Sequence, residues 1–419
     1  MKISDRFPAL ASRDFTIFWV GQFISLTGTW MQNTTLPFLA YRLTGSPFIL
    51  GLIGFSATLP TLLLALPGGV LVEHLDKRKT VIVMQVIMMV QAFLLAFLAL
   101  SGLIRIWHII LLAFLLGTAN AIEITARQAM LIELVGKPAL PNAIALQSTI
   151  FNLARVLGPS LTGVVLLLVQ NQGEGWAFFA NGVSFLFVIG GLLFVRTPYA
   201  NTNHPASLLS TDIPKEFNEG WRYIRGNTLI LLIIIMSAWM GFFGFPFPQQ
   251  IPAVAGTVLH QAADTDKIVQ ARNSLLYLSM GVGALVAALF VSAFSHLRRK
   301  GMLMMIGEFT FAGVLVLVAF THNIPFMLVL IGVLGWSMVS QMMMMNTLIQ
   351  LDVPDTLRGR VYSVYLWAVQ GVAPFGSLFI GWLAQAAGVP EAALVGGSLC
   401  LLALVFIHVK WPILRQNIS

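Results

Sequence analysis

The chain has 419 residues, of which 58% are hydrophobic and only 10% are charged, and its formal net charge is +8. Soluble proteins carry about 25% charged residues because water must solvate their surface. This composition therefore excludes a water-soluble protein and indicates that lipid surrounds most of the chain. A membrane β-barrel would show short segments in which apolar and polar residues alternate, whereas this chain has long continuous apolar runs. Such runs predict membrane-spanning helices.

Twelve apolar runs are close to the length of about 20 residues that a spanning helix needs. A polar amino-terminal segment precedes them, and because it has no short apolar core with a cleavage site we expect no removable signal peptide. Six runs lie before a polar stretch and six after it. The runs are 15–40, 48–72, 80–101, 107–126, 142–169 and 176–196, then 228–255, 270–294, 302–320, 325–349, 361–386 and 391–411. The sequence thus predicts an all-α membrane protein with an amino-terminal bundle (1–196), a linker (197–227) and a carboxy-terminal bundle (228–419).

The lysines and arginines alternate between the two sides of the predicted helices. With both termini in the cytoplasm, Arg42, Arg105, Lys267 and Arg272 fall outside, Arg155 falls within a helix, and the other nineteen fall inside. Cytoplasmic loops are enriched in positive residues. We therefore expect a bacterial inner-membrane protein with both termini cytoplasmic. The positive charge is explained by this topology, so we expect no nucleic-acid partner.

The linker between the two halves is predicted to contain one short helix. It begins with loop-forming residues such as Pro198. Phe217, Trp221 and Ile224 then recur at helical spacing with charged residues between them. This pattern predicts an amphipathic helix lying in the headgroup layer of the membrane.

The two halves resemble each other in sequence pattern. Glu133 follows the fourth run and precedes a helix that contains Gly158, and Asp352 follows the tenth run and precedes a helix that contains Pro374 and Gly376. Weak symmetry between six-helix halves is typical of transporters built from repeated bundles. We therefore expect two six-helix bundles.

The loop after the second run, residues 68–79, reads GGVLVEHLDKRK. It resembles the signature loop between helices 2 and 3 of the major facilitator superfamily, although Glu73 and His74 stand where that family usually has aspartate and arginine. Glycine allows two helices to approach, and a carboxylate can meet a helix N-terminus or a basic residue of the other bundle. The resemblance implies an inner gate, and the alternative is that the basic residues only fix the topology. The inner-gate residues are Gly69, Glu73, Asp76, Lys77 and Arg78.

Further stretches resemble one branch of that superfamily, the group holding the enterobactin exporter and the macrolide-efflux proteins. They are ARQA (126–129), ELV (133–135), NLARVLGP (152–159) and RGRV (358–361). The resemblance implies the major facilitator fold and secondary transport without enzymatic activity. One feature departs from the drug–proton antiporters: the residues before Gly117 are apolar where those proteins carry an arginine.

We therefore expect an exporter that moves an amphipathic organic solute by alternating access, driven by protons and acting as a monomer. By resemblance, the solute would be a siderophore or a drug-like compound. The alternatives are an importer or lipid carrier of the same fold, or a membrane sensor or scaffold that transports nothing.

Charged residues at membrane depth are the first candidates for a site, because burying a charge in the bilayer is costly. Arg155 lies about 20 Å along its helix from Pro141, and no acidic residue lies within one turn of it. It is expected to bind the solute or to follow the coupling proton, the alternative being a structural contact with a carbonyl group or Asn152. Glu123 is expected to pair with Arg127 one turn away and is a second coupling candidate. Glu308 is expected to reach toward the inner basic residues 298–300.

Neutral amides are expected to complete the cavity, although polar residues in membrane helices often only bond neighbouring helices. The amides concerned are Asn33, Asn120, Asn152 and Gln341.

Metal and nucleotide motifs are absent from the sequence. The seven histidines fall in loops or near helix ends, the single cysteine is Cys400, and no HExxH or GxxxxGK[ST] pattern occurs. We expect no metal, no cofactor and no ATP-driven step.

Overall fold

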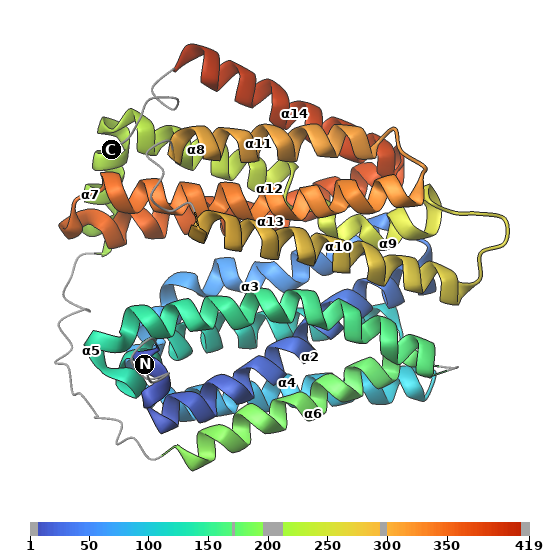
Figure 1. Ribbon diagram of the computed structural model, residues 1–419, viewed down its shortest axis with the longest axis horizontal. Coiled ribbons are helices and arrows are strands. Elements are labelled where there is room, and N and C mark those ends of the chain that lie inside the picture. Colours follow the sequence, from blue (N-terminus) through green and yellow to red (C-terminus); the bar gives the residue numbers. More distant parts are fainter. Residues whose placement is uncertain (1–6, 170–171, 196–212, 294–299, 412–419) are drawn as a thin grey trace. The chain divides into compact units, whose positions relative to one another are not determined.

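A computed structural model describes residues 7–169, 172–195, 213–293 and 300–411. In these ranges every regular element is a helix and no strand is found (Figure 1). The expected all-α class is confirmed for the part of the chain that is described.

The first of two compact units comprises Met1–Leu43 and Ser56–His204. Its long helices run alongside one another (Figure 1), and α4 packs against both α5 and α6. Asp76 begins α4, because its side chain accepts a hydrogen bond from the backbone N–H of Lys79 at 3.0 Å. The elements are η1 (Pro8–Ala11), α2 (Arg13–Thr44), the second part of α3 (Pro47–His74), α4 (Lys77–Leu100), α5 (Ile106–Leu168) and α6 (Gly173–Phe194).

Helix α5 contains two of the predicted spans. The expected boundaries, 126 and 142, both lie inside helix, and the only break is at Gly136, with φ 71° and ψ 165°. Glycine adopts a positive φ without a Cβ clash, and Pro138 suits the first turn of the helix that follows. The predicted ends were wrong here because a one-residue break replaces the expected connection.

The second unit comprises Thr44–Phe55 and Pro205–Ser419. The run 228–255 was expected to form one helix, but α8 ends at Phe243. Three prolines at 246, 248 and 252 follow, and proline interrupts helical hydrogen bonding. Besides the first turns of α3, the elements are α7 (Ile213–Gly226), α8 (Thr228–Phe243), η2 (Phe247–Gln250), α9 (Ile251–Ala253), the π-helical η3 (Val254–Val258), α10 (Asp266–Ala293), α11 (Lys300–Val318), α12 (Ile324–Asp352), α13 (Asp355–Ala386) and α14 (Val389–Lys410).

The helix predicted in the linker is present as α7. Ile224 is buried, Glu219 forms an ion pair with Arg360 of α13, and the Tyr223 hydroxyl donates to the Asp352 carbonyl oxygen at 3.2 Å. Part of this helix therefore packs on protein. Residues 196–212 of the linker region lie outside the described part of the chain.

Ten helical stretches in the described ranges are long and apolar enough to cross a membrane. One of them, Ile106–Val165, has 60 residues, and Gly136 divides it into two spans of sufficient length. The 32-residue α2 is not among the ten, because buried polar residues such as Gln22 and Gln32 lower its hydropathy. With α2 and both parts of α5 counted, the described helices account for twelve spans.

Candidate substrate-binding site

The candidate site of the first unit is built around Arg155, in the second part of α5. One turn later stands Gly158, where an added Cβ would lie 2.9 Å from the backbone nitrogen of Met31 in α2. This close approach of α5 to α2 places the Arg155 guanidinium carbon 5.0 Å from the ring centroid of Trp30 and 5.1 Å from that of Phe151. The two rings meet edge to face with centroids 5.6 Å apart. The Arg155 guanidinium thus lies against a pair of aromatic rings that contact each other.

Arg155 has no carboxylate partner among the described residues. Its side chain is only partly buried, but its Nε atom is buried and has no hydrogen-bond partner there. Aromatic faces attract a cation but do not neutralise it. The expected alternative, a structural contact with Asn152, is not found, because the Asn152 amide donates to the Ser148 carbonyl oxygen of its own helix at 2.9 Å. The site is therefore a cation with unused donor capacity beside two apolar rings, suited to an anionic or carbonyl-bearing amphipathic molecule.

The amides of the first unit that were expected to line the cavity differ in exposure. Asn33 is exposed, and Asn120 and Asn152 are partly buried. Asn33 lies beside Gln32 in sequence, but Gln32 points into the first unit and belongs to the bonded network described next. Their predicted depth in the membrane keeps Asn33, Asn120 and Asn152 as candidates for lining the cavity.

A fully bonded polar network occupies the core of the first unit. The Asn181 amide donates to Gln32 Oε1 at 2.8 Å, the Gln32 amide donates to Gln91 Oε1 at 3.2 Å, and the Gln91 amide donates to the Leu112 carbonyl oxygen at 3.3 Å. The three amide side chains are buried. Because their groups bond one another, this network holds α2, α4, α5 and α6 together.

Glu123 is the second charged candidate of the first unit. It is buried and forms the expected i,i+4 ion pair, with Arg127 Nε 3.0 Å from its Oε1. The Gln85 amide, which the sequence did not indicate, also donates to Oε1 at 3.1 Å. Glu123 is thus neutralised inside its own unit, and no described contact joins it to Arg155.

The candidates of the second unit lie apart from Arg155 in the chain. Gln341 of α12 is fully buried against Gly307 of α11, and neither polar atom of its side chain has a hydrogen-bond partner among the described residues. Of the inner basic residues that Glu308 was expected to reach, 298 and 299 lie outside the described residues. The charged partner of Glu308 in the described part is His408 of α14. The sequence had placed His408 only near a helix end.

The inner loop contributes contacts within the first unit. Lys77 Nζ lies 2.5 Å from Glu133 Oε1 of α5, and the Arg78 guanidinium donates to the Leu193 carbonyl oxygen at 3.0 Å. Asp76 caps α4. The surroundings of Gly69 and the side chain of Glu73 lie outside the described part of the structure, although the backbone there is part of α3. The gate role of this loop stays a prediction.

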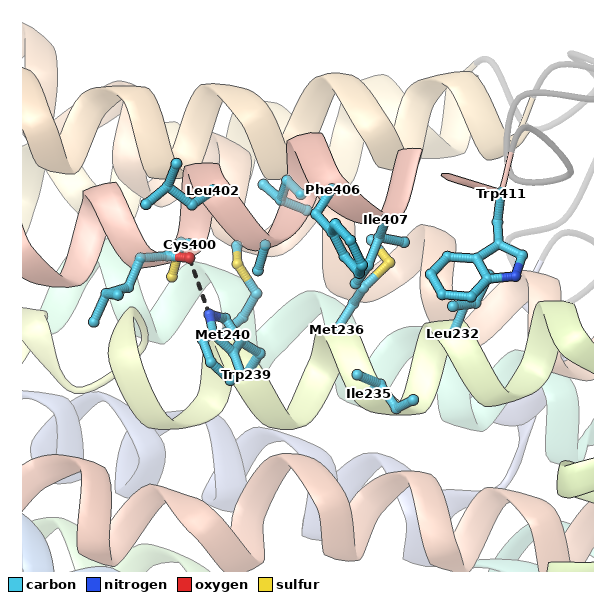
Figure 2. Close-up of a pocket in the computed structure, with 13 residues that line it drawn as sticks. Leu232, Ile235, Met236, Trp239, Met240, Cys400, Leu402, Phe406, Ile407 and Trp411 are labelled. Atoms are coloured by element: carbon cyan, nitrogen blue, oxygen red, sulfur yellow. Dashed lines mark hydrogen bonds between the residues drawn. The ribbon is translucent and has the colours of Figure 1, made fainter. Parts of the chain in front are cut away.

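An apolar groove of about 400 Å³ lies between α8 and α14 of the second unit (Figure 2). Trp239, Phe406 and Trp411 are among the residues that line it, and the Trp239 indole nitrogen donates to the Leu399 carbonyl oxygen at 3.1 Å. Its accessible lining is apolar, so it has no group that could orient a polar solute. The groove suits hydrocarbon and is not part of the candidate site.

The described residues form helices that account for twelve membrane spans, with polar groups buried inside each unit. The solved structure of the nucleoside transporter NupG matches the chain with a TM-score of 0.68 at 11% identity, covering 95% of this chain and 98% of that one. At such low identity the likeness shows the fold alone. It confirms the expected major facilitator fold.

The chain belongs to the transmembrane secretion effector family, a family of transporters and not of enzymes, whose sequence model matches residues 4–417. The multidrug efflux pump Tap of Mycolicibacterium fortuitum is 24% identical over 93% of each chain. The enterobactin exporter EntS of Shigella boydii is 23% identical over 93% of this chain and 92% of its own. Macrolide efflux protein A of Streptococcus pyogenes is 19% identical over 96% of each. The resemblance to this branch is confirmed, and the chain is a multi-pass membrane protein with bacterial homologues.

Proposed function

We propose that this protein exports an amphipathic organic solute, a siderophore or a drug-like compound, by alternating access driven by the proton gradient. The efflux activities in the names of its relatives favour this direction and these solutes. We further propose that it acts as a monomer in the bacterial inner membrane with both termini in the cytoplasm. Residues 1–196 and 228–419 would form the two bundles that alternate, and the loop at 68–79 would form the inner gate.

The observation that carries the proposal is Arg155. A guanidinium is always protonated in proteins, and a charge away from water must be compensated. No described carboxylate compensates Arg155, so a carboxylate, catecholate or carbonyl oxygen of the solute would do so during part of the cycle. Trp30 and Phe151 would contact the apolar part of the same molecule.

The test replaces Arg155 with lysine and with alanine. Arg155→Lys keeps the charge but loses the planar fork of donors, so it should weaken binding while the protein still inserts. Arg155→Ala should abolish efflux of enterobactin and of a macrolide from cells. Arg105→Lys, in an exposed arginine at the start of the same helix, is the matched control and should behave like the wild type.

Membrane abundance is measured for each variant beside affinity and efflux. Normal affinity and efflux in Arg155→Ala would exclude the substrate role. Loss of abundance in both Arg155 variants, with Arg105→Lys unaffected, would assign Arg155 to helix packing. Net uptake in the wild type would identify an importer, phospholipid movement would identify a lipid carrier, and no movement of any of these compounds would favour a sensor or scaffold.

A further inference from the structure

A second buried ionisable cluster lies in the second unit, far from Arg155 in sequence. Glu308 of α11 has no exposed surface, and His408, in the last turn of α14, is 1% exposed. Glu308 Oε2 and His408 Nε2 lie 3.4 Å apart. The other polar atom of each side chain, Glu308 Oε1 and His408 Nδ1, is buried and has no hydrogen-bond partner in the described part of the chain.

The distance between the two groups indicates their charge state. Charge-assisted hydrogen bonds between a cationic nitrogen and a carboxylate are about 2.7–2.9 Å long. A contact of 3.4 Å is longer than that, so the two groups do not form the close ion pair that would compensate two buried charges. A neutral pair is also what a dry interior favours, because an ionised group there needs close compensation.

No other charge among the described residues is placed to hold Glu308 ionised. Helix α11 packs against α12 and α14, and α14 packs also against α8, α13 and η3. Helices α8 and η3 have no ionisable side chain, and α12 has only Asp352, which accepts a hydrogen bond from the Asn227 amide. The remaining ionisable groups with described side chains are Lys300, eight residues before Glu308 at the start of α11, then Arg360, Tyr362 and Tyr365 of α13 and Glu391, Cys400 and Lys410 of α14. In the described part of the chain, the ionisable group in contact with Glu308 is His408.

We propose that Glu308 and His408 form a proton-binding site within the second unit. In the described conformation the Glu308 carboxyl holds one proton. When water reaches the pair, the carboxyl gives this proton to a water molecule, and the carboxylate left behind accepts a hydrogen bond from His408 Nε2–H. A hydronium ion later returns the proton to Glu308 and leaves as water, so that one proton is carried per cycle.

The role of this site in transport rests on the proposed proton-coupled export, whereas the binding of the proton can be measured without a substrate. The full-length protein in phospholipid nanodiscs is titrated with pH while infrared difference spectra are recorded in H2O and D2O. The wild type should show a protonated carboxyl band at neutral pH that shifts in D2O and disappears only at alkaline pH. Glu308→Gln, which keeps the shape and the polar group of the side chain, should lose this band.

The matched control is Glu391→Gln, which removes an exposed carboxylate from the first turn of α14 and should leave the band unchanged. His408→Leu removes the group that stabilises the carboxylate, so the band should persist to a pH at least one unit higher. An unchanged band in Glu308→Gln, or no such band in the wild type at neutral pH, would overturn the proposal.

Transport in proteoliposomes then separates the two proposals. With enterobactin or a macrolide as the probe, a pH gradient should accelerate wild-type transport at least tenfold, and Glu308→Gln should lose this acceleration while still moving the probe down its own gradient. Full acceleration in Glu308→Gln would overturn the coupling role. If the wild type moves neither probe, the proposed function fails on those solutes, and the infrared titration still decides whether the pair binds a proton.

Discussion

The aromatic rings beside Arg155 give a prediction at the scale of single residues. A cation–π contact contributes about 0.5–2 kcal/mol, which corresponds to a change of about 2- to 30-fold in affinity. Trp30→Leu keeps an apolar side chain but removes the ring that lies 5.0 Å from the guanidinium. Because Trp30 would hold the guanidinium in place for the proposed solute, we expect the dissociation constant for enterobactin or a macrolide to rise by up to that factor.

Binding to purified protein by isothermal titration checks this value. Trp107→Leu, an exposed tryptophan in the first turn of α5, serves as the control. Equal affinities for Trp30→Leu and the wild type would show that the solute does not contact this side of Arg155.

A buried ion pair at the start of α10 contributes to the dependence of stability on acid. Arg272 donates to both carboxylate oxygens of Asp264 at 2.8 Å and to the carbonyl oxygens of Ala255 and Leu259. The hydrogen bond from Arg272, with a second one from the Gln261 backbone, lowers the pKa of Asp264 below its ordinary value of 3.8. The sequence had indicated Arg272 only as an outward-facing charge, but here it joins η3 to α10.

Because the pKa of Asp264 is lower in the folded protein than in the unfolded chain, its stabilisation is fully present above the unfolded pKa. It is lost as the pH falls below 3.8 toward the folded pKa. We expect the wild-type melting temperature to fall more steeply between about pH 5 and pH 3 than that of Asp264→Asn. Asp266→Asn, in a neighbouring exposed carboxylate, should keep the wild-type slope. Parallel curves for Asp264→Asn and the wild type would contradict the prediction.

At the scale of helices, α10 and α12 cross at a contact between glycines. A Cβ on Gly283 would collide with the carbonyl oxygen of Gly332 and would lie 3.0 Å from the backbone nitrogen of Trp336. Small residues at such crossings let membrane helices pack backbone to backbone. The sequence shows these glycines but does not show that they face each other.

Gly283→Ala should therefore destabilise the second unit by about 1–3 kcal/mol, the usual cost of overpacking. Gly313→Ala is the matched control, because nothing lies within 4 Å of a Cβ at that position. The measurement is unfolding of the purified protein in mixed micelles. Because alanine favours a helix more than glycine does, Gly313→Ala should lose no stability, and a similar loss in both variants would show that the effect does not come from the crossing.

Substitutions of Asp76, which caps α4, distinguish its structural role from its proposed gate role. Asparagine caps a helix about as well as aspartate, whereas alanine costs about 1 kcal/mol. We expect Asp76→Ala to lower stability and Asp76→Asn to preserve it. If the carboxylate charge serves the gate, Asp76→Asn and Glu73→Gln should slow transport while leaving substrate binding intact. Wild-type transport rates in both variants would show that the loop at 68–79 only fixes the topology and has no gate role.

For the whole molecule, the distribution of lysine and arginine predicts the orientation in the membrane. Reporter fusions after Asn201 and Ile418 should report cytoplasm, and a fusion after Gln261 should report periplasm. The physical reason is that short positively charged loops are retained on the cytoplasmic side. A periplasmic signal at Asn201 would contradict the whole scheme of alternating helices.

The sequence by itself determined the class of protein, the number of spans and the family. Each of these rests on local or summed properties, namely the length of apolar runs, the scarcity of charge and the order of short motifs. The same local logic found the Glu123–Arg127 pair, because residues four apart on a helix are neighbours. At Gly136 and at the prolines after Phe243, local rules allow either a continuous helix or a break. The sequence therefore did not place the helix ends there.

Only the tertiary structure decided which distant residues meet. Arg155 was a candidate from its depth alone, but its position against Trp30 depends on the close packing of α5 on α2 at Gly158. Glu308 and His408 are 100 residues apart in sequence, and Arg272 bonds carbonyl groups that a broken helix turns toward it. Contacts between separate helices are set by crossing geometry and rotation about each axis, which depend on all the side chains at the interface together and leave no periodic signal in the chain.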